Sequence, residues 1–359
     1  MANCGISRRL VNFAKAAVGH VTGGMGIVCV IACMFFAAIS GSGVATAAAI
    51  GGIMIPIMRQ EEYDTGFACS VTSMASAVGP IIPPSVPFIL YAIVCDVSIV
   101  DLFAGGLVPG LMMGIAMMIT VYFYSKKHGY GKKYARASGR EIWRAFWDAK
   151  WSLAMPVIVL GGIYMGIFTP TESAVVACVY SLIIGFFVYR EIKFTELFKI
   201  AGRATATMGQ IMALLIFANV FGKLLLLNNV PQQMAAAVMA FTDSKIVVLL
   251  LVNIILLIAG MFLDTLCAIV IFAPLLLAIV TPYGVSSLHF GVVMAVNLAI
   301  GLSTPPVGAS LYVATGIARL PIEKAFRPLI PLLIANLIVL MMITYYEPFV
   351  TFLPHLLRS

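Results

Sequence analysis

Charged residues are scarce in this chain. Only 10% of its 359 residues are charged, 62% are hydrophobic, and the mean hydropathy is +1.07. Soluble domains carry about 25% charged residues, so this composition excludes a soluble globular domain and indicates a membrane protein. The first 20 residues are basic and amphipathic and lack the apolar core of a cleavable signal peptide. Membrane insertion is therefore expected to depend on internal segments.

The sequence also lacks the motifs of the common enzyme mechanisms. It contains no GxSxG elbow, no GxxxxGK phosphate loop and no HExxH zinc motif. These absences exclude an ATP-driven pump on this chain, and they favour a protein that is not an enzyme and holds no cofactor. The seven cysteines lie mostly inside apolar runs, where cysteine behaves as a small hydrophobic residue, so no disulfide framework is expected.

Two similar segments, 75–94 and 298–317, each contain an interrupted apolar helix. The helix stops at Gly79 in the first and at Gly301 in the second, passes a Pro-Pro pair and resumes before a Leu-Tyr. Proline removes a backbone donor and clashes with the preceding turn, so each break leaves carbonyl groups without helical partners at membrane depth. Two matching broken helices indicate the ion and substrate sites of a transporter.

Apolar runs of membrane-spanning length fill most of the chain. They cover 24–58, 66–94, 102–124, 151–168, 172–189, 204–227, 246–281, 290–318 and 328–345. The first run is divided by SGSG at 40–43 and the seventh near Asp264 and Thr265. We expect both to be re-entrant hairpins that enter and leave by the same face, which requires protein or a wet cavity around the tip.

The placement of the positive charges fits this scheme. With two hairpins that do not cross, one side receives the linkers 1–23, 59–65, 125–150, 190–203 and 319–327, with 19 of the 22 lysines and arginines. The positive-inside rule makes that side cytoplasmic. Lys223, Lys245 and Arg358 remain on the other side. The net charge of +8 therefore reflects topology and contact with membrane lipid, and no nucleic-acid partner is expected.

The repeat extends beyond the broken helices. Each unit has an amphipathic arm, a hairpin, a broken helix and a closing helix, and five crossings separate the two arms, so the second unit is inverted. The predicted organisation is a cytoplasmic arm (1–23), a first repeat (24–124, with hairpin 24–58, broken helix 66–94 and helix 102–124), a basic cytoplasmic linker (125–150), a second repeat (151–345, with helices 151–227, arm 230–242, hairpin 246–281, broken helix 290–318 and helix 328–345) and a C-terminal tail (346–359).

The two arms differ in what precedes them. Three apolar helices (151–227) come before the second arm, whereas only a few residues come before the first. By this symmetry we expect the chain to be N-terminally short by about 70 residues, or about three helices.

Several motifs in a fixed order resemble one transporter family. The arm GISRRLVNFAKAAVGH, the tip ISGSGVATAAAIGGIMIPIM, EEYDTGFA, GPIIPPS, FTPTESAVVA, GMFLD and NLAIGLSTPPVGASLYVA are similar to the large membrane subunit of tripartite ATP-independent periplasmic (TRAP) transporters. The resemblance covers residues 5 to 345. The first tip departs from the family, since Gly43 and Thr46 stand where an alanine and an acid are common.

This resemblance implies a fold, a function and partners. The expected fold is an all-α polytopic membrane protein with an inverted repeat, two re-entrant hairpins, two broken helices and an elevator-type architecture. The expected function is sodium-gradient-driven uptake of an organic acid, such as a C4-dicarboxylate or a sialic acid, across the bacterial inner membrane. The expected partners are a periplasmic substrate-binding protein and a small four-helix membrane subunit.

Sodium ions are coordinated by about five or six oxygen atoms, and neutral carbonyl and hydroxyl groups can bind an ion of single charge. The sequence offers two such sets, and the resemblance points to the same positions of the first. The predicted sodium site 1 consists of Ser40, Ser42, Gly79, Ile82 and Pro84. The predicted sodium site 2 consists of Gly260, Asp264, Gly301, Thr304 and Val307.

The substrate is expected between the tips and the half-helices that follow the breaks, whose N-termini carry positive dipole ends. The predicted substrate residues are Ser40, Gly41, Ser85, Thr304 and Pro305. Purely structural roles for these residues also remain open. The serines can bond to their own backbone, Asp264 can bond to a neighbouring helix, Glu172 can cap its own helix, and Lys223 can extend to the outer interface of the membrane.

Two other functions also remain open. A sodium/dicarboxylate symporter or a channel would need no binding protein. A membrane-embedded enzyme, with Asp264 and Asp96 as hypothetical acids, would turn over in detergent without an ion gradient.

Overall fold

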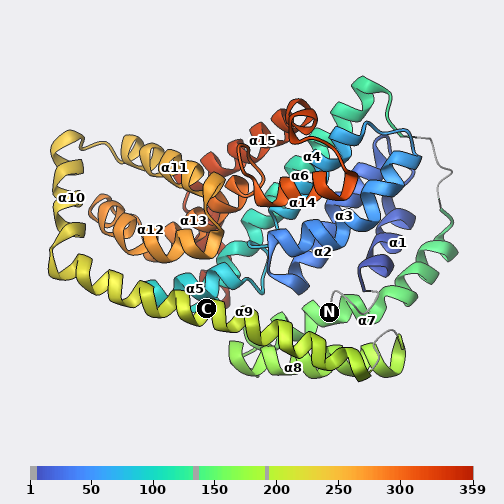
Figure 1. Cartoon of the computed structure of the whole chain (residues 1–359), viewed down its shortest axis with the longest axis horizontal. Coiled ribbons are helices and arrows are strands. Elements are labelled where there is room, and N and C mark those ends of the chain that lie inside the picture. Colours follow the sequence, from blue (N-terminus) through green and yellow to red (C-terminus); the bar gives the residue numbers. More distant parts are fainter. Residues whose placement is uncertain (1–5, 132–136, 191–193, 359) are drawn as a thin grey trace.

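The computed structural model describes residues 6–131, 137–190 and 194–358, and this part of the chain is entirely helical, with no β-strand (Figure 1). The first half contains α1 (Ile6–Val18), α2 (Gly24–Ser40), α3 (Gly43–Gln60), α4 (Thr65–Ser76), α5 (Val86–Cys95) and α6 (Ile99–His128). The second half contains α7 (Gly139–Tyr164), α8 (Pro170–Ile183, continued by a π-helical turn, Ile184–Val188), α9 (Phe194–Leu227), α10 (Val230–Phe241), α11 (Lys245–Phe262), α12 (Thr265–Val280), α13 (Ser287–Gly301), α14 (Ala309–Ala318), α15 (Ile322–Tyr345) and α16 (Pro348–Arg358).

Side-chain caps determine where many of these helices begin. Ser42, Ser85 and Asp264 each accept a hydrogen bond from a backbone amide of the first turn that follows. Thr169 and Glu172 form a capping box at the start of α8, so the capping role expected of Glu172 is confirmed. These caps satisfy amides that would otherwise lack partners within the bilayer.

Helices α2 and α3 form the first re-entrant hairpin. Its tip is the short turn at Gly41 and Ser42. At the end of the hairpin away from the tip, α2 and α3 pack against each other, since the Met58 side chain lies 3.8 Å from the position of a Cβ on Gly26. Tyr63, just after α3, is buried beside Gly131, and burial raises the pKa of its hydroxyl to about 12. The open end therefore lies at the same face as Gly129 to Gly131, which follow α6.

Helices α11 and α12 form the second hairpin, with its tip at Leu263 and Asp264. Its ends are tied together, because the Tyr283 hydroxyl donates to the carbonyl of Thr242 (2.8 Å) and Lys245 Nζ to that of Gly284 (3.5 Å). The Tyr345 hydroxyl at the end of α15 donates to the carbonyl of Ile246.

The two hairpins open to opposite faces. The segment after the first hairpin borders the start of α15, where a Cβ on Gly66 would lie 2.5 Å from the carbonyl oxygen of Lys324. The second hairpin instead meets the end of α15. Because α15 is long enough to cross the membrane, its two ends lie on opposite sides. The inverted repeat expected from the sequence is confirmed.

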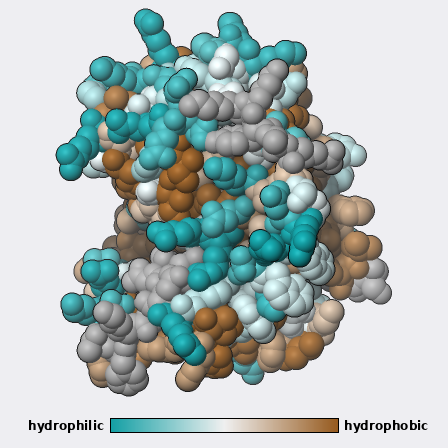
Figure 2. Space-filling view, turned by 90° about the vertical axis from the view of Figure 1, so that its right-hand side faces the viewer, coloured by the Kyte–Doolittle hydropathy of each residue, from teal (hydrophilic) through white to brown (hydrophobic). Residues whose placement is uncertain are grey.

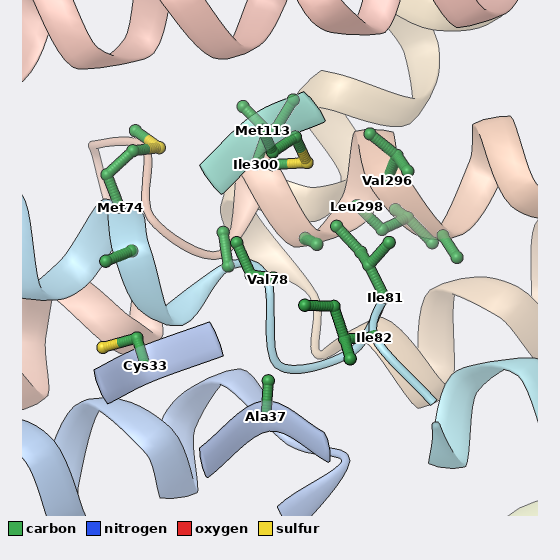
Figure 3. Packing of buried hydrophobic residues seen from close by; sticks show 14 of the residues in the cluster. Cys33, Ala37, Met74, Val78, Ile81, Ile82, Met113, Val296, Leu298 and Ile300 are labelled. Atoms are coloured by element: carbon green, nitrogen blue, oxygen red, sulfur yellow. The ribbon is translucent and has the colours of Figure 1, made fainter. Parts of the chain in front are cut away.

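The breaks occupy the middle of the molecule. The first runs from the end of α4 at Ser76 to Val86 and the second from Gly301 to Ala309, and the peptide bonds Pro83-Pro84 and Pro305-Pro306 are cis. Figure 3 shows Ile81 and Ile82 of the first break among buried side chains of α2, α4, α6 and α13. The irregular backbone is therefore enclosed by protein, as membrane depth requires.

Seven helices of the described part are long and apolar enough to span a bilayer, and α9 differs from the others because none of its central segment is buried. Helices α7 to α10 form an outer layer along one side of the compact body (Figure 1). The end of the molecule on the right of Figure 1, where α1 lies, carries many hydrophilic residues between smaller hydrophobic patches (Figure 2).

Several boundaries differ from the sequence expectation. α9 begins at Phe194, inside the expected linker 190–203, and α6 extends beyond the expected 102–124 at both ends. α4 ends at Ser76, before Gly79, and the following residues form turns. α7 begins at Gly139, inside the expected basic linker, because Ser138 and Glu141 form a capping box. Much of the expected tail forms α16, whose Val350 is buried against Gly105 of α6.

Candidate functional site

The tip of the first hairpin packs backbone to backbone against the first break. A Cβ on Gly79 would lie 2.7 Å from the carbonyl oxygen of Ser42, and a Cβ on Gly41 would lie 2.6 Å from that of Pro84. Only glycine permits such close approach, and Gly41 also has a positive φ of 62°. Ser42, Gly79 and Pro84 of the predicted sodium site 1 are thereby brought together.

Oxygen atoms converge on this contact from both sides. In the tip, Ser40 Oγ lies 2.9 Å from Thr46 Oγ1, which donates to the carbonyl of Ser42 (2.7 Å). In the break, the carbonyl oxygens of Gly79, Ile82 and Pro84 accept no hydrogen bond from the described residues. Thr46, at the position where the family often has an acid, therefore organises the tip through its hydroxyl.

The second tip and the second break meet in the same manner. A Cβ on Gly301 would lie 2.7 Å from the backbone of Gly260, and the Gly308 amide lies 3.5 Å from the carbonyl oxygen of Met261. This contact brings Gly260 and Gly301 of the predicted sodium site 2 together. It is the counterpart, in the inverted unit, of the contact between Ser42 and Gly79.

Most carbonyl oxygens of the predicted sodium site 2 also accept no hydrogen bond from the described residues. Within the described chain, the carbonyl oxygens of Gly260, Thr304 and Val307 accept no hydrogen bond, whereas that of Gly301 accepts one from the Thr304 amide (2.9 Å). Asp264 caps α12 by accepting from the Leu266 amide (3.0 Å). Its side chain is exposed.

A cavity of about 340 Å³ lies between the two tips. Its lining residues come from the first tip (Ser40 to Ala45), the first break and α5 (Pro80, Val86, Pro87), the second tip (Asp264 to Leu266), Leu302 of the second break, and Thr207 and Ile211 of α9. This volume lies in the range of small-molecule binding sites. Both hairpins, both breaks and the outer layer of helices thus meet at one cavity.

Polar groups are few in this cavity. Asp264 is the only charged residue among the described residues that line it. Thr265 is 3% exposed, and its hydroxyl has no hydrogen-bond partner in the described structure, although a buried hydroxyl normally finds one. An organic acid entering this space would meet the negative charge of Asp264. A cation beside the tips would offset that repulsion.

The predicted substrate residues are only partly gathered here. Ser40 and Gly41 line the cavity. Ser85 is buried instead, donates to the carbonyl of Pro80 and caps the Phe88 amide. The Thr304 hydroxyl donates to the carbonyl of Ile300 (2.8 Å). Ser85, Thr304 and Pro305 are not among the lining residues, so these three side chains serve the breaks themselves.

Sequence reasoning missed several residues of the cavity. Thr265 and Leu266 directly follow the predicted tip and could have been included with it. Thr207 and Ile211 carry no comparable signal, because they lie in a long apolar helix with no break or motif. Their position at the cavity depends on how α9 packs across the two tips.

Comparisons with known proteins agree with this architecture. Residues 1–349 match the family described as "Tripartite ATP-independent periplasmic transporter, DctM component". An isethionate TRAP transporter permease protein of Oleidesulfovibrio alaskensis is 46% identical over 341 residues, which are 95% of this chain and 54% of that protein. A sialic acid large permease protein of Vibrio cholerae is 37% identical over 99% of this chain and 83% of its own length. A C4-dicarboxylate large permease protein of Pseudomonas aeruginosa is 39% identical over 96% and 81%.

One solved structure supports the fold at low sequence identity. The crystal structure of the Alcanivorax borkumensis YdaH transporter superimposes with a TM-score of 0.66, covering 97% of this chain and 86% of that chain, at 14% identity. The arrangement of helices is therefore one that an experimentally determined transporter also adopts.

Proposed function

The chain belongs to the DctM component family of tripartite ATP-independent periplasmic transporters, and we propose that it couples a sodium gradient to the uptake of an organic acid. It is a multi-pass protein of the bacterial inner membrane, and its relatives are transporter permeases rather than enzymes. The chain spans about half of the isethionate permease, at 54%, and about four fifths of the two large permeases.

The observation that carries the proposal is the pair of matched contacts between a hairpin tip and a break. At each contact, carbonyl oxygens that accept no hydrogen bond from the part of the chain that the structure describes lie next to backbone that only glycine allows. Buried carbonyl groups without partners are costly, and a monovalent cation can replace the missing partners. We assign sodium ions to the predicted sites 1 and 2.

The cavity between the tips supports an acidic substrate bound together with sodium. Its one charged lining residue within the described chain is Asp264, which repels an organic acid until cations occupy the tips. This electrostatic dependence couples substrate binding to sodium binding. The relatives named for isethionate, sialic acid and C4-dicarboxylate all carry organic acids, so the substrate class is an organic anion.

Alternating access would follow an elevator mechanism. The unit of hairpins, broken helices and closing helices would move as one body against the outer layer α7 to α10. The cavity lies at the boundary of the two parts, because its lining includes both tips and also Thr207 and Ile211 of α9. A periplasmic binding protein would deliver the substrate, and a small four-helix membrane subunit would complete the assembly.

Uptake into proteoliposomes tests this function. The complete transporter would be reconstituted with an inward sodium gradient and labelled isethionate, succinate or sialic acid, with and without its binding protein. We expect one of these acids to accumulate only when both the gradient and the binding protein are present. Accumulation without the binding protein would instead identify a simple sodium/dicarboxylate symporter, and turnover of the acid without a gradient would identify an enzyme.

A further inference from the structure

A second cavity, of about 410 Å³, lies between the outer helices α9 and α10 and the inner helices α5 and α12. Its walls are mostly apolar, with Ile93, Val94 and Pro274 among them. Among the described residues that line it, Lys223 is the only charged one and Gln232 is the only other polar one. We call this space the outer cavity.

The outer cavity and the cavity between the tips lie along one seam. α5, α9 and α12 line both cavities. On each of these helices, the residues that line the outer cavity come later in the sequence than those that line the cavity between the tips. On α9 the lining passes from Thr207 and Ile211 to Gly222 and Lys223. A rise of 1.5 Å per residue separates Ile211 from Gly222 by about 16 Å. The two cavities therefore lie one after the other along the same three helices.

The outer cavity lies toward the periplasmic side. α9 begins at Phe194, inside the basic segment 190–203 that the positive-inside rule places in the cytoplasm, so its other end, with Lys223, faces outward. In Figure 1 this end of α9 meets α10 at the left, with α12 beside it. The right-hand end carries the many hydrophilic residues seen in Figure 2.

We propose that the outer cavity is the vestibule through which the organic anion reaches the tips from the periplasm, and that Lys223 binds its carboxylate or sulfonate group there. This inference rests on the proposed function. An ammonium group makes a charge-assisted hydrogen bond to an anion, and the exposed position of Lys223 leaves its ammonium group accessible to such a ligand. The vestibule then presents a positive charge, while the cavity between the tips presents the negative charge of Asp264 until sodium binds.

In this proposal Lys223 contributes to the affinity for the anion, and Asp264 makes anion binding depend on sodium. Lys223 would hold the anion whether or not sodium is bound, whereas Asp264 would release or admit it according to the occupancy of the sodium sites. A Cβ on Gly222 would meet nothing within 4 Å, so the space beside this residue is open. A long side chain there would fill the path without a clash at its base.

Variants of Lys223 test the anion contact. In proteoliposomes of the complete transporter, Lys223→Gln should raise the KM for uptake of the transported acid about tenfold while kcat and the sodium dependence stay near the wild type. Lys223→Arg should restore most of the affinity. Lys245→Gln, the matched control outside the vestibule, should leave KM unchanged. Added salt should raise KM in the wild type more than in Lys223→Gln.

A second pair of variants tests the vestibule itself. Gly222→Met should reduce uptake at least fivefold, whereas Gly209→Met, also on α9 with nothing within 4 Å and outside both cavities, should leave it near normal. The inference is overturned if Lys223→Gln keeps its KM within twofold, or if the two glycine variants behave alike, while the wild type transports. A wild type that transports no organic acid with a sodium gradient contradicts the proposed function instead.

Discussion

Single glycines determine whether each hairpin tip can reach its break. Gly79 faces the carbonyl group of Ser42, and Gly301 faces Gly260, at distances that leave no room for a methyl group. The hydroxyl groups of Ser40 and Thr46 then fix the first tip. The contribution of these residues is geometric, since they allow the backbones of two segments to approach each other closely; in the proposed mechanism the carbonyl oxygens of both segments then bind one ion.

Gly79→Ala tests this requirement. The added methyl group must displace the Ser42 carbonyl, so we expect sodium-dependent uptake to fall at least tenfold and the protein to lose about 1–3 kcal/mol of stability. Thermal unfolding in detergent and uptake at saturating sodium would measure the two effects. Gly52→Ala on the exposed face of α3, where a Cβ meets nothing within 4 Å, is the control and should change neither. Normal uptake by Gly79→Ala would show that the tight tip contact is dispensable.

Helix α9 borders both cavities and both hairpin tips. It lies across the tips and lines both the cavity between them and the outer cavity, while its own central segment is not buried. An elevator mechanism requires α12 to slide past α9, so the α9–α12 boundary must open and reform in each transport cycle.

Cross-linking across this boundary tests the motion. Thr207→Cys combined with Leu266→Cys places one thiol on each side of the cavity, and a short bifunctional maleimide should abolish uptake by joining them. Ser286→Cys with Glu347→Cys is the control, because these residues are hydrogen-bonded (2.8 Å) within the proposed moving unit. Cross-linking of the control should preserve most of the uptake. Full activity of the cross-linked α9–α12 pair would exclude the sliding motion.

The elements differ in how far the sequence predicts them. The breaks follow directly from the glycines and Pro-Pro pairs, and the inverted repeat follows from counting crossings between two similar arms. Residues within an unbroken apolar helix, such as Thr207 and Ile211, give no such signal, because their role depends on which helix packs against them. Asp264 illustrates the same limit, since its neighbours in sequence are apolar but its carboxylate caps α12 at the wall of a cavity.

Lys223 shows why cavities cannot be predicted from one segment. In sequence it is a lone lysine near the end of a spanning helix, a pattern typical of side chains that extend to the membrane interface. In the structure α10 folds back beside α12, and Lys223 becomes part of the cavity wall. The relevant neighbours are far apart in the chain.

For the whole molecule, the two inverted units explain how one binding region can face either side of the membrane. Their hairpins open to opposite faces while their tips meet at a common cavity. In the proposed mechanism, sodium at both tips and the anion between them are bound together before the moving unit carries them across the membrane. Binding of either ligand then raises the affinity for the other by the same factor.

In the proposed mechanism, the predicted sodium sites 1 and 2 hold sodium at the paired tips and breaks. The most direct measurement is the rate of organic-acid uptake by the complete transporter as a function of external sodium concentration, with choline as the replacement cation. Two coupled sites predict a sigmoidal curve with a Hill coefficient above 1 and no uptake in choline. Equal uptake in sodium and in choline would contradict the claim.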